Sequence, residues 1–109
     1  MMSDALKSKL LVASAVRVGV VKLEGEEVLV REIGTLEFAA YGALAKTDKL
    51  RATALLVAAC VVDAEGAALF SESEALEIAA TARIAMPLVT KVMELSGFGE
   101  EDEKHADAS

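Results

Sequence analysis

The sequence contains no tryptophan, one proline, one histidine and one cysteine, and aromatic residues make up only 4% of it. Small-molecule sites are usually lined by apolar and aromatic side chains around a few convergent polar groups. Alanine, valine and leucine must therefore build the core of this chain, whose hydrophobic content is 54%. The composition favours closely packed helices over an aromatic-lined ligand pocket.

Positive charge is also scarce, with 11 Lys+Arg against 18 Asp+Glu and a formal charge of −7. Nucleic acids and anionic membrane surfaces both attract clustered cations. The longest largely apolar stretch, residues 52–62, is much shorter than the roughly 20 residues that span a bilayer. The acidic start of the chain contains no apolar signal core. We therefore expect a cytoplasmic protein that binds neither nucleic acid nor a membrane.

The single cysteine and the single histidine are poor candidates for catalysis. Cys60 lies within a run of alanines and valines, without the basic neighbour that would favour a reactive thiolate. His105 lies in a polar C-terminal segment, where a side chain is seldom held within reach of a substrate. We expect Cys60 to pack as a small buried apolar residue.

The acidic residues are not spaced for a metal ion. The segment Asp63-Ala64-Glu65-Gly66 resembles the beginning of a calcium loop. However, alanines occupy the fifth and sixth positions, where such a loop needs an oxygen ligand and a glycine. A tight turn fits these residues better. Phosphate-loop, dinucleotide-binding and paired-histidine motifs are also missing from the sequence. We expect no metal, no cofactor and no enzymatic activity.

Alternation of apolar and polar residues predicts a β-hairpin over residues 16–33. Valines occupy every second position from residue 16 to 20, and Gly25 lies in the turn. In the second strand, Leu29 and Ile33 lie on one face and the valines on the other. Both faces are partly apolar, and an isolated hairpin is marginal in water.

Helical spacing predicts three helices, at about residues 35–46, 48–62 and 74–96. The second is apolar nearly all round, so it should be buried at the centre of the fold. In the third, Pro87 predicts either a kink or the start of a new helix.

The sequence thus predicts one α+β domain over residues 16–97, in which an N-terminal β-hairpin packs on a small bundle of three to four helices. Residues 1–15 form an arm or a short helix. Residues 98–109 are too polar to pack, and we expect a disordered acidic tail there.

One face of the hairpin should rest on the helices, which leaves the other apolar face open. Such a face can bind another protein, or it can be covered within the domain or in a homo-oligomer, and the sequence leaves these alternatives open. The high apolar content favours self-association. The candidate partner contacts are the larger side chains near the junctions between elements: Leu29, Arg31, Ile33, Phe38, Tyr41 and Phe70.

The order of these elements resembles the tail assembly chaperones of long-tailed bacteriophages. In that family, a strand ending in an Arg-Glu-Leu-like tripeptide precedes a helix, as 28–33 does here. A later valine–aspartate–turn–glycine–leucine–phenylalanine passage joins two helices, as 62–70 does here, and a leucine–asparagine–glycine-like helix end resembles 94–98. The resemblance covers roughly residues 16–103. This sequence lacks two features of the family: the Pro-Glu-Trp-like element at the hairpin turn and the cluster of charges in the first helix.

This resemblance implies a non-catalytic chaperone that binds the hydrophobic tape measure protein. The chaperone would keep that protein soluble while tail tube subunits polymerise around it, and it would be absent from the mature virion. Family members are often also made as a longer frameshifted form that recruits tube subunits. The alternative is a small cytosolic oligomeric adaptor or regulatory subunit unrelated to phage.

Overall fold

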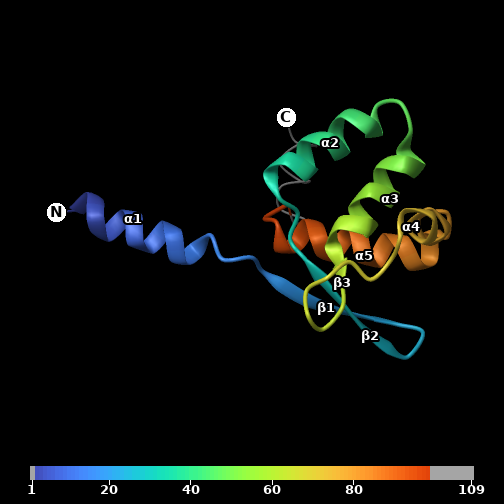
Figure 1. The fold of residues 1–109 in the computed structure, drawn as a ribbon, viewed down its shortest axis with the longest axis horizontal. Coiled ribbons are helices and arrows are strands. Elements are labelled where there is room, and N and C mark those ends of the chain that lie inside the picture. The colour runs from blue at the N-terminus through green and yellow to red at the C-terminus, as the bar shows by residue number, and fades with distance from the viewer. Residues whose placement is uncertain (1, 99–109) are drawn as a thin grey trace, which may run out of the picture.

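The computed structural model describes residues 2–98 of the chain, and their side chains from Asp4 onward. Helices α2 to α5 lie together beside a small sheet, whereas α1 projects away from this body (Figure 1). The predicted α+β class, a hairpin beside a helical bundle, is confirmed. The elements in chain order are α1 (Met2–Ala13), β1 (Val18–Leu23), β2 (Glu26–Arg31), α2 (Thr35–Ala45), α3 (Lys49–Cys60), β3 (Val61–Val62), α4 (Glu72–Ala79) and α5 (Ala82–Leu95).

Strands β1 and β2 form an antiparallel hairpin with a two-residue turn. Leu23 pairs with Glu26, and the turn residues Glu24 and Gly25 have φ angles of +50° and +80°. Two successive positive φ angles give the turn the twist that matches the flanking strands, and glycine adopts such an angle without strain. At the tip, Glu24 accepts a hydrogen bond from Arg83 of α5 at 2.7 Å, which joins the hairpin to the helices.

The sheet has two unlike faces. Helix α5 packs on one of them, where Val30 is fully buried and Val21 and Val28 are half-buried. Helix α5 approaches β1 closely at Gly19, where a Cβ atom would lie 2.8 Å from Cε of Lys91 and would displace the end of that flexible side chain. On the other face, the side chain of Val20 stays exposed.

Helix α3 is the centre of the fold, as its apolar sequence predicts. It packs against α2, α4 and α5, and its buried residues are Ala52, Ala54, Leu56, Val57 and Cys60. Its N-terminus is capped by Asp48, whose side chain accepts a hydrogen bond from the backbone N–H of Arg51 at 3.1 Å.

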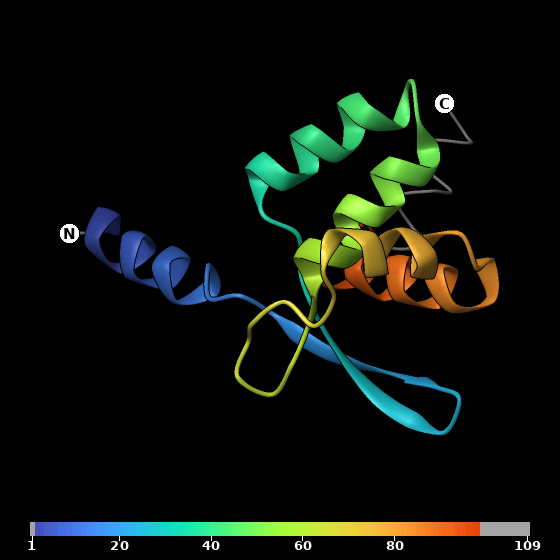
Figure 2. The same ribbon diagram turned by 45° about the vertical axis from the view of Figure 1, so that its right-hand side comes forward.

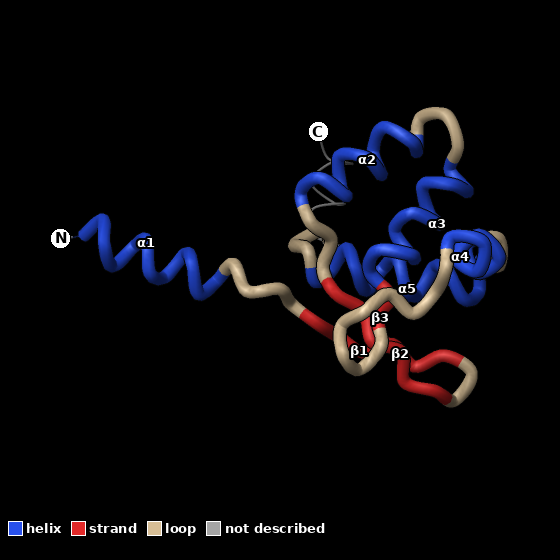
Figure 3. Tube along the Cα trace, in the orientation of Figure 1, coloured by secondary structure: helices blue, strands red, loops and turns tan. Residues whose placement is uncertain are grey.

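The predicted helix 48–62 is too long at its C-terminal end. The helix ends at Cys60, and Val61 and Val62 form a third strand that pairs antiparallel with β2 (Figure 3). Two β-branched residues favour extended backbone, and the free edge of β2 supplies the hydrogen-bonding partner. The sequence pattern of α3 continues into these valines, so only this tertiary pairing distinguishes them from the helix.

Two helices occupy the predicted helical region 74–96, and the boundary between them is not at Pro87, where the sequence allowed one. They are separated at Ala80 and Thr81, and Thr81 takes an extended conformation as the N-cap of α5. Pro87 does not start a new helix but lies within α5. Proline removes one helical hydrogen bond, to the carbonyl of Arg83. Because Arg83 is exposed, water can hydrate that carbonyl.

The C-terminal end of the described chain differs from the prediction at one residue. Phe98, predicted to begin the disordered tail, donates its backbone N–H to the carbonyl of Met93 at 2.7 Å. This bond follows Gly97, whose φ of +92° ends α5 in the left-handed conformation that glycine favours. The rest of the predicted tail, 99–109, lies outside the described residues.

Candidate protein-binding surfaces

The described part of the chain exposes many large apolar side chains, and these are the strongest functional signal in the structure. Scattered single apolar residues are normal on a protein surface, whereas contiguous groups mark binding sites. The exposed residues are Leu6, Leu10, Leu11, Val12, Val16, Val18, Val20, Leu36, Phe38, Leu50, Leu69, Met86 and Phe98. Several of these residues belong to the apolar regions that are described in turn.

Three of the four aromatic rings in the sequence form one stack, which we call the aromatic surface: Phe38, Tyr41 and Phe98. The ring of Phe38 lies between the other two, 4.8 Å from Phe98 and 6.5 Å from Tyr41 between centroids. Phe38 and Phe98 remain 38% and 43% exposed. Stacked rings restrict one another, so this surface is presented to solvent in a fixed arrangement.

An ion pair fixes the helix that carries the aromatic surface. Nη2 of Arg31 donates to both carboxylate oxygens of Glu37, at 3.0 and 2.8 Å. The Glu37 carboxylate also accepts the backbone N–H of Gly34 at 3.0 Å, as in a capping box. The hydrogen bond from Arg31 holds the pKa of Glu37 below its usual value, and the same bond raises the pKa of Arg31. The first turn of α2 is thereby tied to the end of β2.

The outer face of the sheet is the second apolar region. Val18 and Val20 of β1 are 58% and 46% exposed, and Leu29 of β2 lies directly opposite Val20. Residues paired in this way share one face of the sheet. Beyond Leu29, Val62 is buried, and Ala68 pairs with it from the loop that follows β3.

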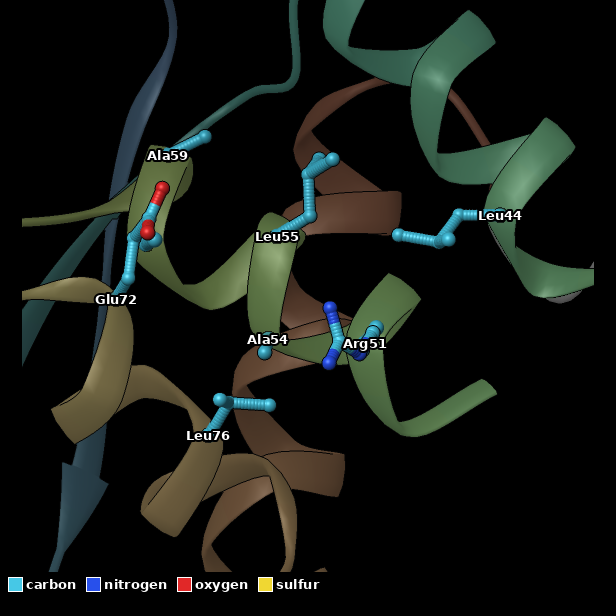
Figure 4. A pocket seen from close by; sticks show the side chains of 8 residues that line it. Leu44, Arg51, Ala54, Leu55, Ala59, Glu72 and Leu76 are labelled. Atoms are coloured by element: carbon cyan, nitrogen blue, oxygen red, sulfur yellow. The ribbon is translucent and has the colours of Figure 1, made fainter. Parts of the chain in front are cut away.

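Two further apolar surfaces are helix α1 and a groove on the opposite side of the body. Leu6 and Leu10 of α1 are 58% and 60% exposed. The groove has a volume of about 460 Å³ and lies between α2, α3 and α4 (Figure 4). It is lined by Leu44, Arg51, Ala54, Leu55, Ala58, Ala59, Glu72 and Leu76. Its lining is mainly apolar, so the groove suits apolar side chains of a helix or peptide.

The structure separates the residues predicted as partner contacts. Phe38 and Tyr41 lie together in the aromatic surface, and Leu29 lies half-buried on the outer sheet face. Arg31 is occupied by its ion pair with Glu37. Phe70 is half-buried against the core.

Ile33 is the one predicted contact that offers no surface, because its side chain is only 8% exposed. Strand β2 ends at Arg31, so the alternation that places Ile33 on the face of Leu29 does not continue that far. Its backbone N–H donates to Oγ of Ser96 at 3.0 Å, which draws Ile33 against the end of α5 and into the core.

Sequence reasoning missed Phe98 and the groove. A lone phenylalanine beside an acidic segment gives no sign that its ring will stack on a residue sixty positions earlier. The groove depends on the angles between three helices, which helical periodicity does not define. The one available signal was the run of alanines on α3, since small side chains leave space above a helix.

Residues with reactive side chains have structural roles here. Cys60 is fully buried, as predicted, and desolvation raises the pKa of its thiol to about 11. The carboxylate of Asp63 accepts the backbone N–H groups of Glu65 and Ala67, at 2.8 and 3.0 Å, which confirms a turn at this position. Between residues 2 and 98, no group of three or more His, Cys, Asp or Glu side chains could hold a metal ion. No helix in that range is long and apolar enough to cross a membrane.

Comparison with known proteins gives a result at the level of structure. No family model and no curated protein matches the sequence. Among solved structures, the bacteriophage HK97 tail assembly chaperone is similar with a TM-score of 0.62 and 19% sequence identity, over 84% of this chain and 94% of that chain. The resemblance noted in the sequence is confirmed for the fold: this chain folds like the tail assembly chaperone of bacteriophage HK97.

Proposed function

We propose that this chain is a non-catalytic tail assembly chaperone of a long-tailed phage. It binds the tape measure protein and keeps it soluble while tail tube subunits assemble around it. The observation that carries this proposal is the similarity to the HK97 tail assembly chaperone, which extends over 84% of the chain and nearly the whole of that protein. The order of sequence motifs supports the same function independently of the structure.

The exposed apolar regions provide surface for binding a hydrophobic protein. A chain that keeps a hydrophobic protein soluble must offer apolar surface to it and remain soluble with it. The aromatic surface and the outer sheet face offer such area, and the formal charge of −7 favours solubility of the complex. The chain acts in the host cytoplasm and leaves the tail before the virion is complete. The tail tube protein is a second partner, reached through a longer form of the chain.

Within this function, we assign the tape measure contact to the aromatic surface. Aromatic residues near the centre of an interface contribute most to binding, because they bury a large area with little loss of side-chain entropy. Phe38 and Phe98 are exposed and already ordered by stacking. Of the residues predicted as contacts, Phe38 and Tyr41 are those that the structure brings together in one exposed group.

Co-expression of the chain with a tape measure fragment tests this assignment. The variant Phe38→Asp places a charge in the aromatic surface, whereas the control Ala40→Asp places the same charge on the far side of α2, where Ala40 is also exposed. We expect wild type and A40D to keep the fragment in the soluble fraction and F38D to lose most of it. Equal solubility with all three proteins would overturn the assignment of the surface. An insoluble fragment with wild type would overturn the chaperone function.

The arrangement of neighbouring genes separates this function from that of an oligomeric adaptor unrelated to phage. A tail assembly chaperone gene is expected between the gene for the tail tube protein and a very long tape measure gene. A neighbourhood without phage tail genes would favour the adaptor.

A further inference from the structure

Helix α1 has an apolar stripe that stays exposed and does not pack on the body formed by the other described elements. Leu6, Leu10 and Ala13 follow one another at spacings of four and three residues, which places them on one side of the helix. Leu6 and Leu10 are more than half exposed. Two views turned by 45° both show α1 detached from the body (Figures 1 and 2).

A helix of this length is not stable by itself. Isolated helices shorter than about 12–15 residues are marginal in water, and most helices in proteins depend on packing of an apolar face. Helix α1 has 12 residues, and burial of its exposed leucines would be favourable in free energy. The helix therefore needs a surface on which to pack.

The body of the same chain does not provide that surface at the groove. Arg17 is anchored to the end of β2, since it exchanges backbone and side-chain hydrogen bonds with Glu32 at 2.9 and 3.0 Å. Only residues 14–16 remain as a tether, and three extended residues span about 10 Å. Both views place α1 at the end of the body opposite α4, which forms one wall of the groove (Figures 1 and 2).

The groove and α1 are complementary in shape. Alanines of α3 form the floor of the groove, which allows another helix to approach closely, and Leu44 and Leu76 stand on opposite sides of it (Figure 4). The leucines of α1 are the kind of side chain that such an apolar groove accepts, at the i and i+4 positions of a docking helix.

The two surfaces are also complementary in charge. Residues 1–15 contain two lysines, Lys7 and Lys9, against one aspartate, in a chain that is otherwise acidic. Helix α4 carries three glutamates and no basic residue, and Glu72 lines the groove itself. The basic residue of the groove lining, Arg51 of α3, is paired with Asp48 at 3.3 Å. The lysines of α1 would therefore lie near the acidic wall when the leucines enter the groove.

We propose that helix α1 of one copy packs into the α2–α3–α4 groove of a second copy. The two contact surfaces differ from each other, so the contact is head-to-tail, and repetition gives a closed ring or an open chain of subunits. This inference specifies the expected self-association and does not depend on the proposed chaperone function.

Variants on each side of the contact test it by sedimentation velocity over a concentration series. Leu6→Asp with Leu10→Asp charges the apolar stripe, and Val12→Asp is the control, on another side of the same helix. Leu55→Arg fills the groove, and Leu50→Arg is the control, because Leu50 is exposed on α3 and does not line the groove. We expect wild type and both controls to grow beyond dimers, and both the stripe variant and the groove variant to remain monomeric.

A mixture of the stripe variant and the groove variant gives a more specific test. The stripe variant keeps an open groove and the groove variant keeps an intact α1, so together they form one contact and must stop at a one-to-one dimer. Thermal unfolding checks that L55R folds, and Leu44→Arg serves as the groove variant if it does not. A monomeric wild type, assembly of L6D/L10D equal to that of wild type, or a mixture that stays monomeric would each overturn the proposal. Loss of tape measure binding in L55R, with self-association unchanged, would show that the groove receives the partner instead.

Discussion

Replacement of Glu37 by glutamine tests how the helix of the aromatic surface is held in place. Glutamine preserves the size of the side chain and an oxygen that can accept the backbone N–H of Gly34. The negative charge is lost, and with it the charge assistance of two hydrogen bonds from Arg31, at 2.8 and 3.0 Å. The substitution therefore isolates the ionic part of the contact.

The solvent exposure of the Arg31–Glu37 pair determines how much the pair adds to the free energy of unfolding. The side chains of Arg31 and Glu37 are 25% and 35% exposed, so water screens the attraction partly. Hydrogen bonds to charged groups contribute about 1.5–3 kcal/mol when well shielded, and exposed ion pairs contribute about 0–1 kcal/mol. For this half-exposed geometry, we expect E37Q to lower the free energy of unfolding by about 1 kcal/mol at neutral pH.

The pKa of Glu37 determines in which direction this stabilisation changes with pH. Arg31 and Gly34 hold the pKa of Glu37 below its usual value in the folded chain. The stabilisation is therefore complete above the pKa of the unfolded chain and is lost as the pH falls through the pKa of the folded chain. The difference between wild type and E37Q should shrink toward zero in acid.

Urea unfolding at a series of pH values measures this difference. Glu65→Gln is the control, because Glu65 is exposed in a loop and forms no ion pair within the described part of the chain. Equal stabilities of wild type and E37Q at neutral pH would refute the reasoning, as would a difference that stays constant down to acid pH.

Four further predictions concern the fold. Gly42→Ala should raise the free energy of unfolding by about 0.5–1 kcal/mol, because Gly42 lies within α2 with open space around its Cβ position. Gly25→Ala should lower the free energy of unfolding, because the φ of Gly25 is +80°. Leu88→Ala should cost about 2–5 kcal/mol, since Leu88 is buried in α5; a loss below that of G25A would contradict its place in the core. A thiol reagent should label Cys60 quickly only in denaturant, and equal rates in native buffer would contradict its burial.

Local patterns predicted the elements whose structure depends on nearby residues. The alternation of valines and the glycine at position 25 predict the hairpin, because strand period and turn geometry are set within a few residues. The apolar circumference of α3 likewise predicts its central position. The strand at Val61 could not be predicted in this way, because it depends on pairing with Val30 of β2, which is distant in sequence.

The binding surfaces were predictable only in part. Phe38 and Tyr41 were selected for their size and position, and they lie together because they are three residues apart on one helix. Phe98 joins them through the packing of α5 against the rest of the body. Ile33 leaves the predicted face because the strand ends two residues earlier and the chain turns into the core.

The central claim is that this chain keeps a tape measure protein soluble by binding it. The most direct test is dilution of an unfolded tape measure fragment into buffer that contains the purified chain, followed by light scattering. The account predicts that scattering falls as the chain approaches equimolar amounts, and that F38D suppresses it far less than A40D does. Scattering that is unaffected by the wild-type chain at any ratio would contradict the account.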